Sequence, residues 1–112
     1  MNPLIQRLST GTQPVTVSNS HHSVADLKQR IEEVKYVFVK FTETQGGTNL
    51  GIKIDEDATD LSRADFDKAT GIAHIEGTLT LDYVKVRCIA NIDLATMNGT
   101  GHLVILEEVK SL

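Results

Sequence analysis

The stretch RCIANIDLATMNGTGHL, from Arg87 to Leu103, contains the residue types of a nucleophilic catalytic site. It holds Cys88, the only cysteine of the chain, together with Asp93 and His102. A thiol nucleophile needs a neighbouring base, and that base needs an acid to orient it, so the three side chains would have to converge. Whether they can converge depends on the secondary structure that carries them.

Apolar residues alternate through this region, which predicts a strand over residues 84–95. Successive side chains of a strand point to opposite faces, so Cys88 shares the inward face with Val86 and Ala90. Asp93 falls on the outward face, and His102 falls there too on the strand that follows. We therefore expect no catalytic residues here, and we expect Cys88 to be a buried, unreactive thiol.

The acidic run DEDATD, residues 55–60, has the composition of a calcium loop. An EF-hand loop requires glycine at its sixth position and glutamate at its twelfth, and these positions hold Asp60 and Phe66. A looser site formed by Asp55, Asp57 and Asp60 stays open as an alternative. A solvated acidic loop is the favoured interpretation.

The adjacent histidines His21 and His22 are the other possible metal ligands. Neighbouring side chains point apart in most backbones, and no third ligand stands at a spacing typical of metal sites. We therefore expect no metal and no cofactor.

Composition limits the function classes. The chain has 112 residues, a net charge of -4 and a pI of about 5.5, with 40% apolar and 23% charged residues. This is one domain with an ordinary core, and its acidic balance makes nucleic acid an unlikely partner. One cysteine permits no internal disulfide, and neither a signal peptide nor a membrane-spanning apolar stretch is evident. A cytoplasmic protein without membrane contact is expected.

The first half of the chain predicts a strand, a helix and a hairpin, preceded by loosely ordered residues 1–13. Residues 14–18 have the composition of an edge strand with a leading proline. An apolar stripe at helical spacing predicts a helix over residues 24–35. Residues 35–55 predict a hairpin with its turn at Gly46-Gly47, which pairs Phe41 with Ile52.

The second half predicts a short helix over residues 63–69 and then a three-stranded meander. Tight reversal near residues 82–83 would pair His74 with Asn91. Asn98-Gly99 is a strong hairpin turn sequence, and placing the turn there pairs Ile92 with Ile105. The resulting fold class is α+β, with a mostly antiparallel sheet of about six strands in the order βαββαβββ and one main helix packed on one face.

The outward face of this meander carries the candidate binding residues. It combines polar side chains with apolar ones, a mixture typical of protein interfaces. The alternative is an ordinary solvent-facing sheet with weak ion pairs, such as those of Arg87 with Glu76 and Glu108, which are expected on either side of Ile89. The candidate interface residues are His74, Arg87, Ile89, Asn91, Asp93, His102, Val104 and Leu106.

Two classes of function follow. The first is a non-enzymatic binding, regulatory or assembly protein that acts through its sheet surface on another protein or on itself. Self-association is expected because the last strand, with Val104 and Leu106, is apolar on both faces and resembles an unprotected sheet edge; the alternative is that the strand over residues 14–18 covers that edge. The second is a small-molecule-binding protein or small enzyme, with a pocket between helix and sheet near the small residues Gly77, Cys88 and Ala90.

Overall fold

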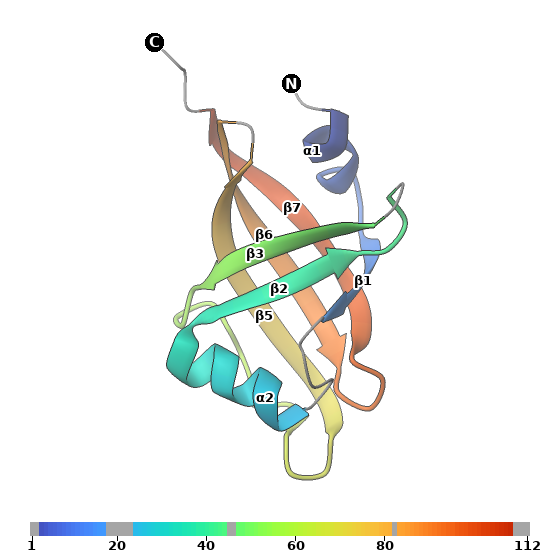
Figure 1. Cartoon of the computed structure of the whole chain (residues 1–112), viewed down its shortest axis with the longest axis vertical. Helices are drawn as coiled ribbons and strands as arrows, with labels where there is room; N and C mark the ends of the chain where they lie inside the picture. Colours follow the sequence, from blue (N-terminus) through green and yellow to red (C-terminus); the bar gives the residue numbers. More distant parts are fainter. Residues whose placement is uncertain (1–2, 18–23, 45–46, 82, 109–112) are drawn as a thin grey trace.

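The computed structural model describes residues 3–17, 24–44, 47–81 and 83–108. These residues form a six-stranded antiparallel β-barrel with a short helical segment near each end (Figure 1). The helical segments are α1 (Pro3–Leu8) and α2 (Val24–Gln29), and α2 continues into the π-helical turn η1 (Arg30–Val34). The strands are β1 (Gln13–Val17), β2 (Tyr36–Phe41), β3 (Thr48–Ile54), the two-residue β4 (Ala64–Asp65), β5 (Thr70–Leu81), β6 (Val84–Asp93) and β7 (Asn98–Glu108).

The sheet closes on itself, which makes the predicted α+β class wrong. Its strand order is β3-β2-β1-β7-β6-β5, with β4 beyond, and β3 also pairs with β5. The closing contacts are Lys53↔Thr78 and Ile54↔Gly77. A closed sheet encloses its own core, so this fold needs no helix laid across a face.

Gly77 makes this closure possible. A Cβ atom built on Gly77 would collide with the backbone carbonyl of Lys53 on β3. Any side chain here would therefore hold the two strands apart, and glycine is the residue that permits such close approach.

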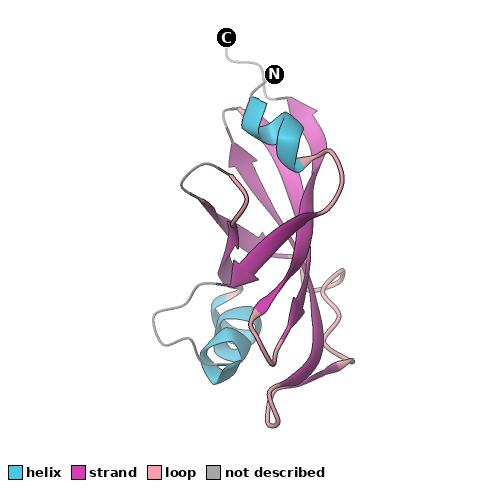
Figure 2. Ribbon diagram, turned by 90° about the vertical axis from the view of Figure 1, so that its right-hand side faces the viewer, coloured by secondary structure: helices cyan, strands magenta, loops and turns pink. Residues whose placement is uncertain are grey.

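The inward faces of all six barrel strands contribute to one core. Its largest fully buried side chains include Phe41, Ile52, Ile75, Ile92 and Leu103. α1 adds Ile5 and Leu8, and the second helical segment adds Leu27 and Ile31. Figure 2 shows the two helices at opposite ends of the strands.

The predicted helix over residues 24–35 is confirmed as helical from Val24 to Val34, although its last turn is π-helical. Lys35 ends it in the left-handed conformation, with φ of 61°. Asp26 and Arg30, four residues apart on this helix, form an ion pair at 2.9 Å. The helix lies at one end of the barrel, so its position across an open sheet was predicted wrongly (Figure 1).

The predicted hairpins of β2 with β3 and of β6 with β7 form, but their registers differ from the prediction. Phe41 pairs with Thr48 instead of Ile52. In the last hairpin Ile92 pairs with Gly99, and Ile105 lies opposite Val86. The chain reverses at residues 94–97, so Asn98-Gly99 belongs to the strand and the predicted turn there is wrong.

Two other local predictions are wrong. Residues 63–69 form turns around β4, because the Asp65 carboxylate accepts the backbone N–H groups of Asp67 and Lys68 at 3.1 and 3.0 Å. Such side-chain acceptors favour turns over helix. β1 is also no edge strand, since it pairs with β2 on one side and with residues 98–101 of β7 on the other.

Candidate protein-binding surfaces

The cysteine, aspartate and histidine of the opening stretch do not come together. Cys88 is completely buried, and burial raises the pKa of its thiol to about 12. The Asp93 carboxylate accepts the backbone N–H of Ala95 at 2.9 Å, within the turn that follows β6. His102 lies opposite Ile89 on the outward face. The predicted burial of the thiol is confirmed, and neither Asp93 nor His102 lies on its inward face.

The acidic loop uses its carboxylates within the chain. Asp55 is ion-paired with Arg87 and accepts the Asp57 backbone N–H, and Asp60 accepts that of Ser62 at 2.9 Å. The hydrogen bond from Arg87 lowers the pKa of Asp55 below its usual value. Among the described residues no group of three His, Cys, Asp or Glu side chains could hold a metal ion, and the His21-His22 pair lies outside them.

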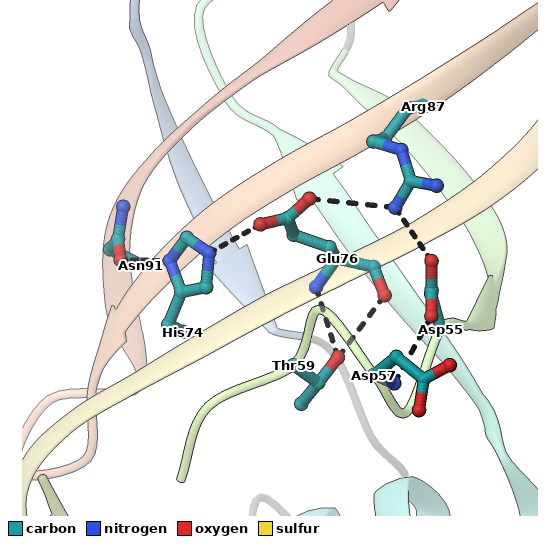
Figure 3. A network of polar contacts seen from close by, with 7 residues as sticks. All are labelled: Asp55, Asp57, Thr59, His74, Glu76, Arg87 and Asn91. Carbon is teal, nitrogen blue, oxygen red and sulfur yellow. Dashed lines mark hydrogen bonds and ion pairs between the residues drawn. The ribbon is translucent and has the colours of Figure 1, made fainter. Parts of the chain in front are cut away.

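The polar half of the predicted outward-face cluster is a connected network (Figure 3). The predicted register between β5 and β6 is confirmed, with His74 opposite Asn91 and Thr78 opposite Arg87. Arg87 Nη1 lies 3.0 Å from Asp55 Oδ2 and 3.4 Å from Glu76 Oε1. Glu108 was expected beside Ile89, but its backbone pairs with Val84.

His74 extends the network at its other side. Its Nδ1 lies 2.7 Å from Asn91 Oδ1, and its Nε2 lies 2.7 Å from Glu76 Oε2. Both ring nitrogens therefore face oxygen acceptors, which only the protonated imidazolium satisfies by donating twice. The hydrogen bond to Asn91, and next the one to Glu76, raise the pKa of His74 above the usual histidine value of 6.5.

The apolar half of the cluster lies beside the network on β6 and β7. Val104 is 38% exposed and Leu106 is 46% exposed, whereas Ile89 is half-buried. Val104 lies opposite Arg87 and His102 opposite Ile89, so these residues share one surface. Asp93 pairs with Asn98 at the far end of the strands, away from this surface.

A second surface was missed by the sequence prediction. Residues 48–52 of β3 have β2 on one side and no described strand on the other. Residues 79–81 of β5 are likewise paired with β6 alone. Between these edges lies a hollow of about 410 Å³, lined by Tyr36, Asn49, Leu50, Gly51, Thr78, Leu79, Thr80 and Leu81, which we name the β3–β5 cleft.

The β3 edge presents backbone groups to this cleft. Ile54 N donates to Lys35 O at 2.9 Å, so Ile54 points its N–H toward β2. Because backbone groups alternate along a strand, Asn49 and Gly51 point theirs the opposite way, into the cleft. Asp55 N donates to Glu76 O on β5 at 2.9 Å, in agreement with this alternation.

Two exposed aromatic side chains lie at the rim of the cleft. Tyr36 and Phe38 are 39% and 37% exposed and meet edge to face, with ring centroids 5.4 Å apart. The Tyr36 hydroxyl occupies the position that a Cβ atom on Gly51 would take. The alternating pattern of YVFVKF could have identified this pair. It directs Tyr36 and Phe38 outward while Val37 and Val39 face the core.

The small residues Gly77, Cys88 and Ala90 do not form the pocket considered as an alternative. Cys88 and Ala90 are completely buried, and Gly77 packs against the β3 backbone. Small side chains here accommodate barrel closure, so these three residues lend no support to a ligand site.

The fold and its surfaces define a small antiparallel barrel that exposes strand edges and aromatic side chains suited to contact with another protein. The chain matches the family model described as core binding factor beta subunit over residues 2–112, and it belongs to that family. This family consists of non-enzymatic protein-binding subunits of a transcription-factor complex, so the predicted binding or regulatory role and the predicted protein partner are confirmed at that level.

A search of curated proteins found no significant match to this chain. Within the described residues, no helix is long and apolar enough to cross a membrane.

Proposed function

We propose that this chain is the beta subunit of a two-component transcription factor and that it binds its partner protein through the β3–β5 cleft. The observation that carries this proposal is the pair of unpaired strand edges facing one hollow. Unpaired edges are usually covered or blocked in folded proteins because they invite pairing with other chains. A partner segment seated in the cleft would use the backbone groups of Asn49 and Gly51.

The family supplies the nature of the partner, since its members bind Runt-domain factors. A net charge of -4 supports a role that acts on transcription through a protein rather than through direct DNA contact. That the chain itself does not bind nucleic acid stays a prediction from its charge.

The outer surface of β6 and β7 is a second candidate interface. Its support is the exposed pair Val104 and Leu106 beside Ile89 and His102, as the sequence predicted. The cleft is favoured because two unpaired edges flank it, residues 48–52 of β3 and residues 79–81 of β5, whereas residues 102–108 of β7 offer a single unpaired edge on a strand that α1 contacts.

Self-association through this outer surface stays a prediction. Its original argument, an unprotected last strand, holds only for part of β7: β1 pairs with residues 98–101 and α1 contacts the strand, but residues 102–108, with Val104 and Leu106, pair with β6 alone among the described strands.

Two matched variants distinguish partner binding at the β3–β5 cleft from partner binding at the outer surface of β6 and β7. Tyr36→Ala removes an aromatic side chain from the cleft rim, and Leu106→Asp places a charge on the outer surface. With a purified Runt domain as the probe in calorimetric titration, Tyr36→Ala should weaken binding by about 1–2 kcal/mol or more, the range of an interface hot spot. Leu106→Asp should leave the affinity unchanged. Unchanged affinity in Tyr36→Ala together with weakened binding in Leu106→Asp would place the interface on the outer surface and overturn the proposal.

A further inference from the structure

The closed end of the β3–β5 cleft is the seam where β3 meets β5. In the described residues this seam consists of two residue pairs, Lys53↔Thr78 and Ile54↔Gly77, followed by the hydrogen bond from Asp55 N to Glu76 O. So short a ladder offers few contacts that resist local opening. The interactions that hold the seam together therefore set the distance between the unpaired edges of β3 and β5.

One guanidinium joins the three elements that meet there. Arg87 on β6 contacts Asp55, the first residue after β3, and Glu76 on β5, through the same Nη1 atom. Their side chains are partly buried, with 26% exposure for Arg87, 32% for Asp55 and 19% for Glu76. We name these three residues the Arg87 clasp.

The glutamate of the clasp is itself fixed in place. His74 binds its other carboxylate oxygen at 2.7 Å, and Asn91 holds the far side of the imidazole. The Thr59 hydroxyl interacts with the backbone N–H and carbonyl of Glu76, each at 3.2 Å, from the loop after Asp55 (Figure 3). The clasp is thus one part of a larger connection between that loop and β5, rather than an isolated surface pair.

We propose that the Arg87 clasp positions the β3–β5 cleft, by pinning the end of β3 to β5 and β6 and so holding the two free edges ready for the partner. This inference rests on the proposed function, because it assumes that the partner binds in the cleft. Arg87, Asp55 and Glu76 act through the strand edges and need no contact with the partner. A preformed site avoids the cost of ordering the edges during binding.

Arg87→Met tests the clasp, because it keeps an apolar stem and removes the charge. The matched control is Lys85→Met, on the same outward face of β6 and outside the clasp. Amide hydrogen exchange should become about fivefold faster at Lys53 and Asp55 in Arg87→Met, with core amides such as Ile92 unchanged. Lys85→Met should leave the seam amides unchanged. Unaltered seam exchange in Arg87→Met would overturn the proposal.

Binding of the purified Runt domain supplies the second measurement. Arg87→Met should weaken it about fivefold, and Arg87→Lys should restore part of the loss, because a lysine reaches one carboxylate but lacks the planar fork. Faster seam exchange with unchanged binding, while Tyr36→Ala still weakens binding, would overturn the clasp and leave the proposed function intact. Unchanged binding in both Tyr36→Ala and Arg87→Met would overturn both. Urea unfolding of each variant verifies that the barrel is folded in the assay.

Discussion

The backbone carbonyl of Lys53 fills the space that a side chain on Gly77 would need, and this contact joins the two ends of the barrel sheet. Gly77→Val should therefore destabilise the protein by about 1–3 kcal/mol, the usual cost of overpacking. Urea unfolding measures this loss, with Thr78→Val as the neighbouring control that should cost little. A Gly77→Val protein as stable as the wild type would mean that the barrel does not close here.

Barrel closure could not be predicted from the sequence, because it depends on a contact between strands that are far apart in the chain. The alternating pattern identifies each strand and its inward face, and both were obtained correctly for β5 and β6. The same pattern fits an open sheet covered by a helix equally well. Gly77 was recognised as a small inward residue, but its role against Lys53 becomes visible only when β3 is placed beside β5.

Hairpin register shows a second limit. Side chains alternate with a period of two, so a shift by an even number of residues leaves every apolar side chain on the same face. The turn sequence must then decide, and Asn98-Gly99 pointed to the wrong position. The true turn places Met97 at φ of 62° and anchors Ala95 to the Asp93 carboxylate. The Gly99 position inside β7 is instead crowded by the Asn91 carbonyl, which excludes a side chain.

The candidate site was predictable in part for the same reasons. Correct register between β5 and β6 placed His74 beside Asn91 and Glu76 within reach of Arg87. The role of Asp55 was missed, because its loop reaches Arg87 only through the seam between β3 and β5. The cleft was missed because unpaired edges are a property of the closed sheet and leave no mark in local sequence.

The corrected register changes what truncation of the core should cost. Ile92 is completely buried and pairs with Gly99, whereas Ile105 is partly exposed and pairs with Val86. Ile92→Ala should cost about 2–5 kcal/mol of unfolding free energy, and Ile105→Ala should cost clearly less. Denaturant unfolding of the two variants compares them directly. Equal losses of unfolding free energy in the two variants would favour the register predicted from the sequence, in which Ile92 and Ile105 are cross-strand partners.

Cys88 should be inert in the native protein. Its complete burial and its pKa of about 12 leave almost no accessible thiolate at neutral pH, and the thiolate is the reactive form. A thiol reagent should label the native chain only at the rate of unfolding and label it fully in denaturant. Rapid native labelling would reopen the question of a nucleophilic cysteine.

His74 should make stability depend on pH near neutrality. Its pKa in the folded protein is raised above 6.5 by its bonds to Asn91 and Glu76, so folding favours the protonated form. This contribution is fully present below the unfolded pKa and is lost as pH rises through the folded pKa. His74→Gln serves as the reference, and its deficit in unfolding free energy should shrink over the interval in which the pH rises from below 6.5 through the raised pKa of the folded protein.

Over that pH interval, the contribution of His74 to the unfolding free energy can be measured apart from those of the carboxylates. Asp55 and Asp60 have pKa values lowered below 3.8, so their contributions are present above that value and disappear only as pH falls further. A deficit of His74→Gln that stays constant across the interval would show that the imidazolium is not held as the geometry indicates.

Hydrogen exchange of the chain with and without a bound Runt domain tests the central claim most directly. If the partner occupies the β3–β5 cleft, the amides of Asn49 and Gly51, which face it from β3, should exchange much more slowly in the complex. The amides of the exposed residues Val104 and Leu106 on the outer surface should exchange as fast in the complex as in the free protein. Protection confined to the strands around Val104 and Leu106, with Asn49 and Gly51 unchanged, would contradict the account and assign partner binding to the outer surface.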